Sequence, residues 1–224
     1  TTAELAANPA VVADELEPER TVYIEYSNEI WNGKFAQADW VRARGMVLQL
    51  ASDAYTAQLR FYSRRAVQCF EIFGQEFSNG YPIVRVLAAQ AANVWTGKMI
   101  LEFEGASQRA DAIAIAPYFG GGWGDPAKLA GVLALTTDAM LTALDSDVAV
   151  SRQQAEKYAA LTTRHGLKLI AYEGGQHLAG RGGAENNDQL TALFHAVTRD
   201  PRMGDLYRRY LSDWAKVGGD LFCL

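Results

Sequence analysis

Cysteine is scarce in this chain. Among its 224 residues only Cys69 and Cys223 are cysteines, and neither belongs to a Cys-x-x-Cys motif. Two cysteines cannot build the disulfide framework of a small secreted domain. They could pair only if the fold brings them together, and we expect two unpaired thiols.

Long apolar runs and clusters of basic residues are also missing. No stretch reaches about 18 apolar residues without interruption, so we expect no membrane-spanning segment and no membrane partner. The formal net charge is −5 and no Lys/Arg run forms a basic stripe, so we expect no nucleic-acid partner. The N-terminus lacks a basic region followed by an apolar core, so no signal peptide is visible.

The chain has enough apolar residues for a core. Hydrophobic residues make up 49% of the sequence, and we expect a single catalytic domain over residues 1–224. Strand-like and helix-like segments alternate along it. The expected strands lie at 21–28, 83–90, 112–118, 167–173 and 220–224. The expected helices lie at 2–15, 36–74 (as one helix or two), 94–104, 126–144, 148–165 (capped by Gly166) and 188–217.

Strands separated by helices indicate βαβ units and a parallel sheet. An open doubly wound sheet and a (β/α)8 barrel, or TIM barrel, both fit this order. Polar residues finish the strands at their C-terminal tips, where barrels build their active sites, and we therefore favour the α/β barrel. With five strands present, about three of the eight would be missing. The chain also begins without a Met and ends in a strand-like segment, which predicts a piece of a longer protein.

Two of these strands end in a glutamate. Residues 22–26 are largely β-branched and aromatic and lead into Asn28-Glu29, while the strand at 167–172 leads into Glu173. A glycosidase needs one carboxyl group that protonates the glycosidic oxygen and one carboxylate that attacks the anomeric carbon. We therefore expect Glu29 and Glu173 to form a catalytic pair. As an alternative, either could be an ordinary acid at a turn or in a loop salt bridge.

The stretch at 24–29, Ile-Glu-Tyr-Ser-Asn-Glu, resembles the fourth barrel strand of clan A glycoside hydrolases, in which an Asn-Glu pair is the hallmark. The resemblance implies that Glu29 is the acid/base and that Asn28 contacts the sugar 2-hydroxyl. It also implies that Glu173, at the end of the seventh strand, is the nucleophile. Tyr118, at the end of the sixth, would touch that nucleophile. The five expected strands would then be strands four to eight of the barrel.

The same resemblance covers the whole chain as a strand order but only short stretches as motifs. It places the missing barrel strands in a preceding segment or in a separate chain. It implies a β-linked oligo- or polysaccharide as substrate and no cofactor. An extracellular or periplasmic location is favoured.

Further residues near the strand tips could bind the substrate, because sugars stack on aromatic rings and hydrogen-bond to amides. The candidates are Trp31, Trp95, Trp123, Gln90, Asn93 and His177. Each has an alternative: the indoles could pack in the core or on a loop, the two amides could cap the next helix, and the histidine could lie on a surface loop. Glu25 is expected inside the barrel with a satisfied hydrogen bond.

Three functions are open at this point. The first is a retaining glycoside hydrolase that acts by double displacement on β-linked sugars. The second is a carbohydrate-binding barrel protein without turnover, although the presence of both Glu29 and Glu173 argues against it. The third is a barrel hydrolase of another kind that uses a metal, although no His/Asp/Glu group has the spacing of a metal site.

Overall fold

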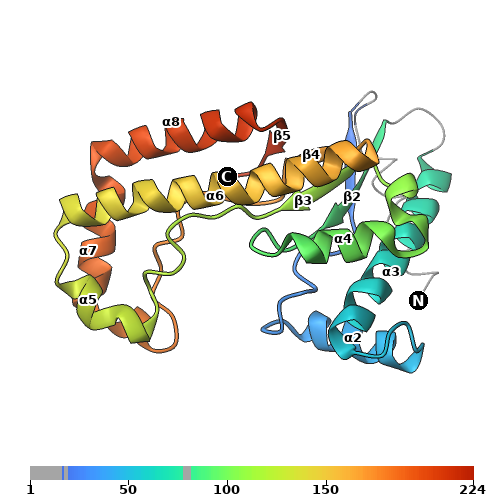
Figure 1. The fold of residues 1–224 in the computed structure, drawn as a ribbon, viewed down its shortest axis with the longest axis horizontal. Helices are drawn as coiled ribbons and strands as arrows, with labels where there is room; N and C mark the ends of the chain where they lie inside the picture. The colour runs from blue at the N-terminus through green and yellow to red at the C-terminus, as the bar shows by residue number, and fades with distance from the viewer. Residues whose placement is uncertain (1–16, 18–19, 78–81) are drawn as a thin grey trace.

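The chain forms an α/β structure around one parallel sheet (Figure 1). The computed structural model describes residues 17, 20–77 and 82–224, so the helix expected at 2–15 lies outside it. Each strand is parallel to its neighbours, and the order is β1-β2-β3-β4-β5. The strands are β1 (Val22–Glu25), β2 (Ile83–Ala88), β3 (Ala112–Ile115), β4 (Lys168–Ala171) and β5 (Gly219–Phe222).

All five strands form where the sequence predicts them, within a few residues, but each is short. The polar ends of the expected strands leave the sheet and become the turns that follow it. The strand order contains no reversal, so the doubly wound alternative does not describe this sheet. Among the described residues, β1 and β5 each have one strand neighbour, and the sheet therefore has two edges.

Helices connect the strands throughout. In the described residues the α-helices are α2 (Ala36–Val47), α3 (Ala54–Glu76), α4 (Val94–Glu102), α5 (Leu129–Leu133), α6 (Thr137–His165), α7 (Asp188–Arg199) and α8 (Pro201–Lys216). The short 3₁₀ helices are η1 (Phe103–Arg109), η2 (Pro126–Lys128) and η3 (Ala184–Asn186).

The connection between β3 and β4 differs from the expected helices at 126–144 and 148–165. Its long helix, α6, runs unbroken for 29 residues, and the break comes earlier, after the short helix α5. Thr136 caps α6, because its side chain accepts a hydrogen bond from the backbone N–H of Ala139. Residues 145–147 contain neither proline nor glycine, so nothing there ends a helix.

Two other helical regions are divided. Region 36–74 forms two helices, and the side chain of Asp53 caps the second. Region 188–217 is divided before Pro201, because proline cannot continue α7 but fits the first turn of α8. The expected cap at Gly166 is confirmed, since this residue ends α6 in the left-handed conformation with φ of 67°.

The two faces of the sheet are covered differently. On one face, which we call the outer face, alternate strand residues pack against helices α3, α4, α6 and α8. These strand residues are Ile24, Leu87, Ile113, Ile115, Leu169 and Ala171. On the opposite, inner face lies a small cluster to which no helix contributes in the described residues. Its members are Val86, Ala112, Ala114 and Ile170.

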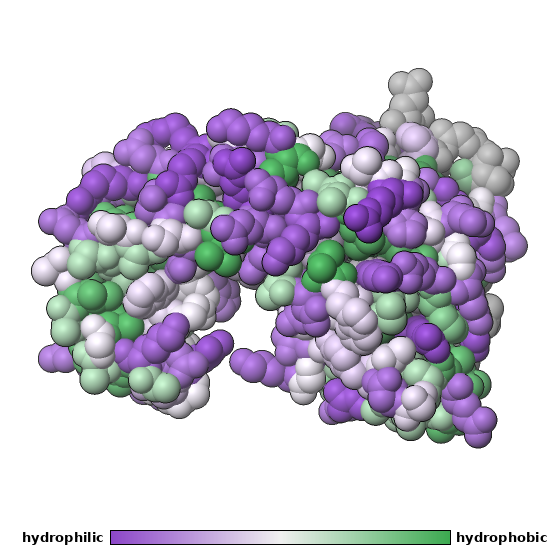
Figure 2. All heavy atoms as spheres, in the orientation of Figure 1, coloured by the Kyte–Doolittle hydropathy of each residue, from purple (hydrophilic) through white to green (hydrophobic). Residues whose placement is uncertain are grey.

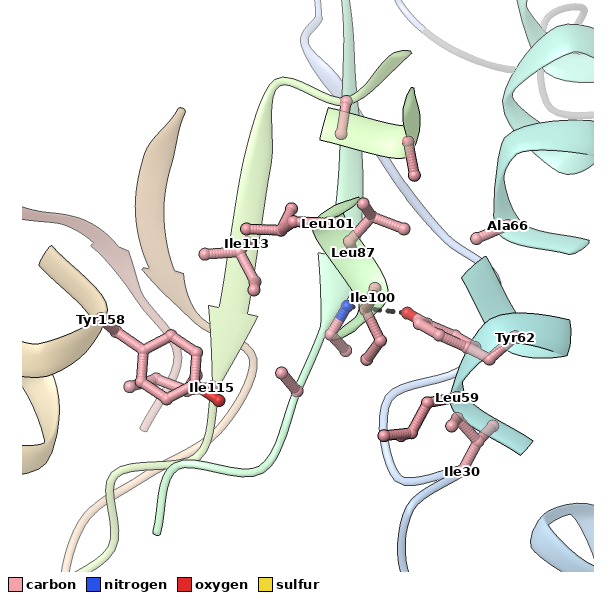
Figure 3. Packing of buried hydrophobic residues seen from close by; sticks show 14 of the residues in the cluster. Ile30, Leu59, Tyr62, Ala66, Leu87, Ile100, Leu101, Ile113, Ile115 and Tyr158 are labelled. Carbon is pink, nitrogen blue, oxygen red and sulfur yellow. Dashed lines mark hydrogen bonds between the residues drawn. The ribbon is translucent and has the colours of Figure 1, made fainter. Parts of the chain in front are cut away.

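The outer face is closely packed where α3 lies against the sheet (Figure 3). Tyr62 is fully buried, and its hydroxyl accepts a hydrogen bond of 2.7 Å from the backbone N–H of Ala88 in β2. Leu59, Ile100 and Ile113 are fully buried around it. Burying a side chain of this size contributes roughly 1.5–3 kcal/mol, so this region holds β2 and β3 firmly against the helices.

A second hydrophobic cluster joins α5, α6, α7 and α8, and Phe119 enters it from the loop after β3. Helix α6 takes part in both clusters and so ties them together. The space-filling view shows an open notch between this second part and the part formed by α2 and α3 (Figure 2). In the same view hydrophilic side chains cover much of α6 and α8.

Both cysteines have free thiols, as expected: Cys69 is buried and Cys223 is exposed. None of the helices in the described part of the chain has the length and apolar character needed to cross a membrane.

Candidate functional site

Glu29 lies in the turn that follows β1. The backbone N–H of Asn32 donates to the Glu29 carbonyl at 2.9 Å, and the Asn32 side-chain amide donates to the Glu29 carboxylate at 3.0 Å. Ile30 is fully buried and anchors the turn, and the side-chain amide of Gln58 donates to its carbonyl. The turn therefore holds its own carboxylate. Asn32 is a site residue that was not expected from the sequence. A polar side chain three positions after a carboxylate in a turn could have indicated it.

Glu173 stands at the corresponding place after β4. The residue before it, Tyr172, is still tied to the sheet, since its N–H donates to a carbonyl of β3 at 3.2 Å. Directly after Glu173 the chain turns through two glycines. A Cβ at Gly174 would lie 2.5 Å from the ring of Phe222, and Gly175 has a φ of 112°, so both positions require glycine. This tight turn leaves Glu173 at the strand tip.

The charges of both carboxylates raise the pKa values of the same two tyrosines, Tyr118 and Tyr172. The pKa of Tyr118 is raised to about 12 by burial first, and then by the charge of Glu173, a hydrogen bond with Glu173 and the charge of Glu29, in that order. Burial also raises the pKa of Tyr172, followed by the charges of Glu29 and Glu173. Because such effects weaken with distance, the two glutamates lie at one site although they are far apart in the sequence.

Glu25 joins these acids from β1, where it lies beside Val86 on the inner face. Burial raises the pKa of Glu25 to about 7, and the charge of Glu173 contributes to the rise. Its Oε1 atom is buried and has no hydrogen-bond partner among the described residues. The interior position matches the expectation, but the expected satisfied hydrogen bond is wrong for this oxygen.

Two of the expected substrate-binding residues lie next to Tyr118. The ring centroids of Tyr118 and His177 are 4.9 Å apart. Trp123 and Tyr118 line the same cavity, which has a volume of about 200 Å³. The structure therefore brings His177 and Trp123 into the neighbourhood of the two carboxylates.

For three expected residues that follow β2, the structure shows other surroundings or other contacts. Trp95 lines a cavity between α4 and α6, on the outer side of the sheet. Asn93 occupies the position before α4, but its side chain makes no capping hydrogen bond. The carbonyl of Gln90 accepts a hydrogen bond from a tyrosine of α6. Within the described residues, no interaction links these three side chains to the carboxylate pair.

Asn28 and Trp31 flank Glu29 in the turn, and both are partly buried. Trp31 packs against the main hydrophobic cluster, and its Nε1 atom is buried without a partner among the described residues. The ring therefore contributes to packing, and its stacking on a sugar stays a prediction. Asn28 directly precedes Glu29, and its contact with a sugar hydroxyl stays a prediction.

A larger cavity lies elsewhere. It has a volume of about 490 Å³, and α2 and α3 line it with Trp40 and three arginines, while Tyr26 closes it on the sheet side. The volume of a cavity alone therefore does not identify the functional site in this molecule. The acidic groups at the strand ends are the better guide, because clustered carboxylates are costly unless they serve a function.

The chemistry of the site is that of carboxylates and tyrosine hydroxyls, which suits nucleophilic attack and proton transfer. Among the described residues no group of three or more His, Cys, Asp or Glu side chains is placed to hold a metal ion. Comparisons of the chain with protein-family models, with curated proteins and with solved structures found no match.

Proposed function

We propose that this protein is a retaining glycoside hydrolase that cleaves β-linked glycosides or polysaccharides. The observation that supports it best is that the charges of Glu29 and Glu173 both raise the pKa values of the same two residues, Tyr118 and Tyr172. Two carboxylates that reach one site from different strand ends are the minimum equipment for hydrolysis of a glycosidic bond.

In this mechanism the carboxylate of Glu173 attacks the anomeric carbon. The bond from that carbon to the leaving oxygen breaks, and Glu29 donates a proton to the oxygen. The product is a covalent glycosyl-enzyme. Glu29 then takes a proton from a water molecule, which attacks the same carbon and releases Glu173. Two displacements restore the original anomeric configuration.

Three neighbouring side chains assist the pair. The Tyr118 hydroxyl forms a hydrogen bond with Glu173 and orients it. The amide of Asn32 holds the carboxylate of Glu29. Asn28 hydrogen-bonds to the 2-hydroxyl of the sugar, a bond that strengthens as positive charge develops at the anomeric centre.

We also propose that the five strands are consecutive strands of a (β/α)8 barrel. Their parallel, sequential order supports this, as do the helices, which in the described part of the chain pack on the outer face. In a barrel the carboxyl ends of the strands open on one mouth, which agrees with the place of both glutamates. A preceding segment or a separate chain then supplies the other strands.

Replacing the nucleophile tests the proposal. Glu173→Ala is expected to abolish turnover of aryl β-glycosides, and added azide is expected to give a glycosyl azide of inverted configuration, because azide attacks from the face that the carboxylate leaves free. With Glu29→Ala, azide is expected to give the opposite configuration, because it attacks the glycosyl-enzyme. Glu102→Ala, which removes an exposed carboxylate from α4, is the control.

Two outcomes contradict the proposal in different ways. Full activity of Glu173→Ala would remove this residue as the nucleophile. Sugar binding by the unmodified protein without any hydrolysis would instead favour the non-catalytic carbohydrate-binding barrel.

A further inference from the structure

A small cavity lies beside Tyr118, on the side of the loop that follows β3. Its volume is about 200 Å³, which suits a single sugar unit. It is lined by Tyr118, Gly121, Trp123, Lys128, Asp147 and Val150. Tyr118 belongs to both this cavity and the carboxylate site, so the two are contiguous.

The walls of this cavity are held by backbone hydrogen bonds. The N–H of Phe119 donates to the Gly175 carbonyl at 3.0 Å, and the N–H of His177 donates back to the Phe119 carbonyl at 2.8 Å. Farther along, the N–H of Arg181 donates to the Gly124 carbonyl at 3.0 Å. A Cβ at Gly124 would lie 1.7 Å from a backbone oxygen, so the two loops approach as closely as glycine allows. A cavity held in this way is preorganised for a ligand.

Rigid elements position the polar groups of the cavity. Asp147 and Val150 are one turn apart on the long helix α6. The Trp123 indole N–H donates to the Asp147 carboxylate at 2.6 Å, which fixes the plane of the ring. Val150 is 49% exposed and gives the cavity an apolar wall.

Lys128 and Asp147 face the cavity as opposite charges without pairing with each other. Within the described residues, Lys128 forms no ion pair, and its ammonium lies 5.5 Å from the centre of the Trp123 ring. Asp147 uses one carboxylate oxygen for the indole, which leaves the other free to accept hydrogen bonds. An ammonium donor, a carboxylate acceptor and an indole face together match the hydroxyl groups and the apolar face of a pyranose.

We propose that this cavity is a second sugar subsite, which binds the glycosyl unit next to the one that Glu173 attacks, on the side away from the leaving group. Its ligand class is a β-linked chain of neutral sugars with at least two units before the scissile bond. The inference rests on the proposed hydrolase function and deepens it.

The orientation follows from the position of the loop that carries Tyr118. The loop after β3 lies against the turn that follows Glu173, since the N–H of Phe119 donates to the Gly175 carbonyl, whereas β1 is two strands away, so the cavity lies nearer the nucleophile than the proton donor. In a retaining hydrolase the leaving group departs on the side of the proton donor. The cavity therefore accommodates the part of the chain that stays on the enzyme, and Tyr118 separates the two sugar units.

The test compares 4-nitrophenyl β-monoglycosides with the matching β-disaccharides in glucosyl, mannosyl and xylosyl series. In the series that the unmodified protein hydrolyses, Trp123→Ala is expected to lower kcat/KM about tenfold more for the disaccharide than for the monoglycoside. Lys128→Met, an exposed substitution that spares the core, is expected to act in the same direction. Trp40→Ala, an exposed indole on α2, is the matched control.

Equal losses on both substrates, or none in either variant, would overturn the subsite while leaving the hydrolase function intact. Absence of hydrolysis in the unmodified protein would reject the hydrolase function. Calorimetric titration with the same disaccharides then decides whether the cavity binds sugar. Binding that is lost in Trp123→Ala and Lys128→Met supports the subsite. Binding that survives both substitutions, or no binding at all, overturns it.

Discussion

At the scale of single residues, Glu25 depends most clearly on its surroundings. An ordinary glutamate carboxyl has a pKa of 4.5, whereas burial beside Val86 and the charge of Glu173 raise the pKa of Glu25 to about 7. The charged form is disfavoured because one oxygen is buried without a hydrogen-bond donor. Near neutral pH this residue therefore keeps a proton for part of the time, next to a proposed nucleophile.

We predict that Glu25→Gln changes how stability depends on pH. Between pH 4.5 and about 7 the folded protein keeps a proton on Glu25 that the unfolded chain has released. The free energy of unfolding of the parent therefore falls as the pH rises through this window, by roughly 3 kcal/mol at most. Glutamine has no such proton. Urea unfolding is therefore expected to show that the free energy of unfolding of the variant rises relative to that of the parent as the pH increases across the window.

The control for this experiment is Glu102→Gln, which also removes one carboxylate but from an exposed position on α4. Parallel pH curves for the parent and Glu25→Gln would show that the Glu25 carboxyl is not buried in this way.

A second prediction at this scale concerns the hydroxyl of Tyr118. Tyr118→Phe removes its hydrogen bond with Glu173 but keeps the ring. Hydrogen bonds to charged groups contribute roughly 1.5–3 kcal/mol, so kcat on the best aryl β-glycoside is expected to fall about ten- to a hundredfold. Tyr23→Phe, on the exposed part of β1, is the control, and equal activity of both variants would remove Tyr118 from the mechanism.

At the scale of elements, the contact between α2 and α3 depends on one glycine. A Cβ at Gly45 would lie 2.2 Å from the backbone oxygen of Ala57, so the two helices touch backbone to backbone at this point. By contrast, Gly74 in α3 has open space around its missing Cβ.

These two glycines give opposite predictions for the same substitution. Gly45→Ala is expected to destabilise the protein by roughly 1–3 kcal/mol, because the backbone of α3 must move away. Gly74→Ala is expected to stabilise it by up to about 1 kcal/mol, because alanine favours the helix more than glycine does. Thermal unfolding measures both, and a higher Tm for Gly45→Ala would mean that the helices are not in contact there.

At the scale of the whole molecule, the sheet has two edges in the described residues, and β1 forms one of them. An edge strand offers unpaired N–H and C=O groups to other chains. Tyr23 is 43% exposed on this strand, which adds an apolar side chain to the edge.

We predict that the chain alone self-associates as its concentration rises and that Tyr23→Lys weakens this association, because a charge on an edge strand opposes pairing. Sedimentation velocity measures the effect. Val47→Lys, which adds the same charge to the exposed end of α2, controls for net charge. A monomer at every concentration, or equal effects of the two substitutions, would exclude β1 as the interface.

The sequence predicted much of the fold, because strands and helices follow from local patterns. The five strands, the parallel pairing and the cap at Gly166 were predictable from hydrophobic runs and a single glycine. The boundaries of α5 and α6 were not predictable. Thr136 caps the start of α6, but no local residue type marks that position strongly in the sequence. Tyr118, Trp123 and His177 were predicted near the acids, whereas Trp95 turned to the outer side of the sheet, since the face on which a residue after a strand emerges depends on the next helix.

By itself, then, the sequence determined which segments are strands and that acids stand at two of their ends, because both properties are local. Only the tertiary structure decided that the charges of both Glu29 and Glu173 raise the pKa of Tyr118 and that Glu25 is buried near Glu173. It also decided that Lys128 and Asp147 face the same cavity. These facts depend on the strand order and on burial, and both arise from contacts between residues that are distant in the chain.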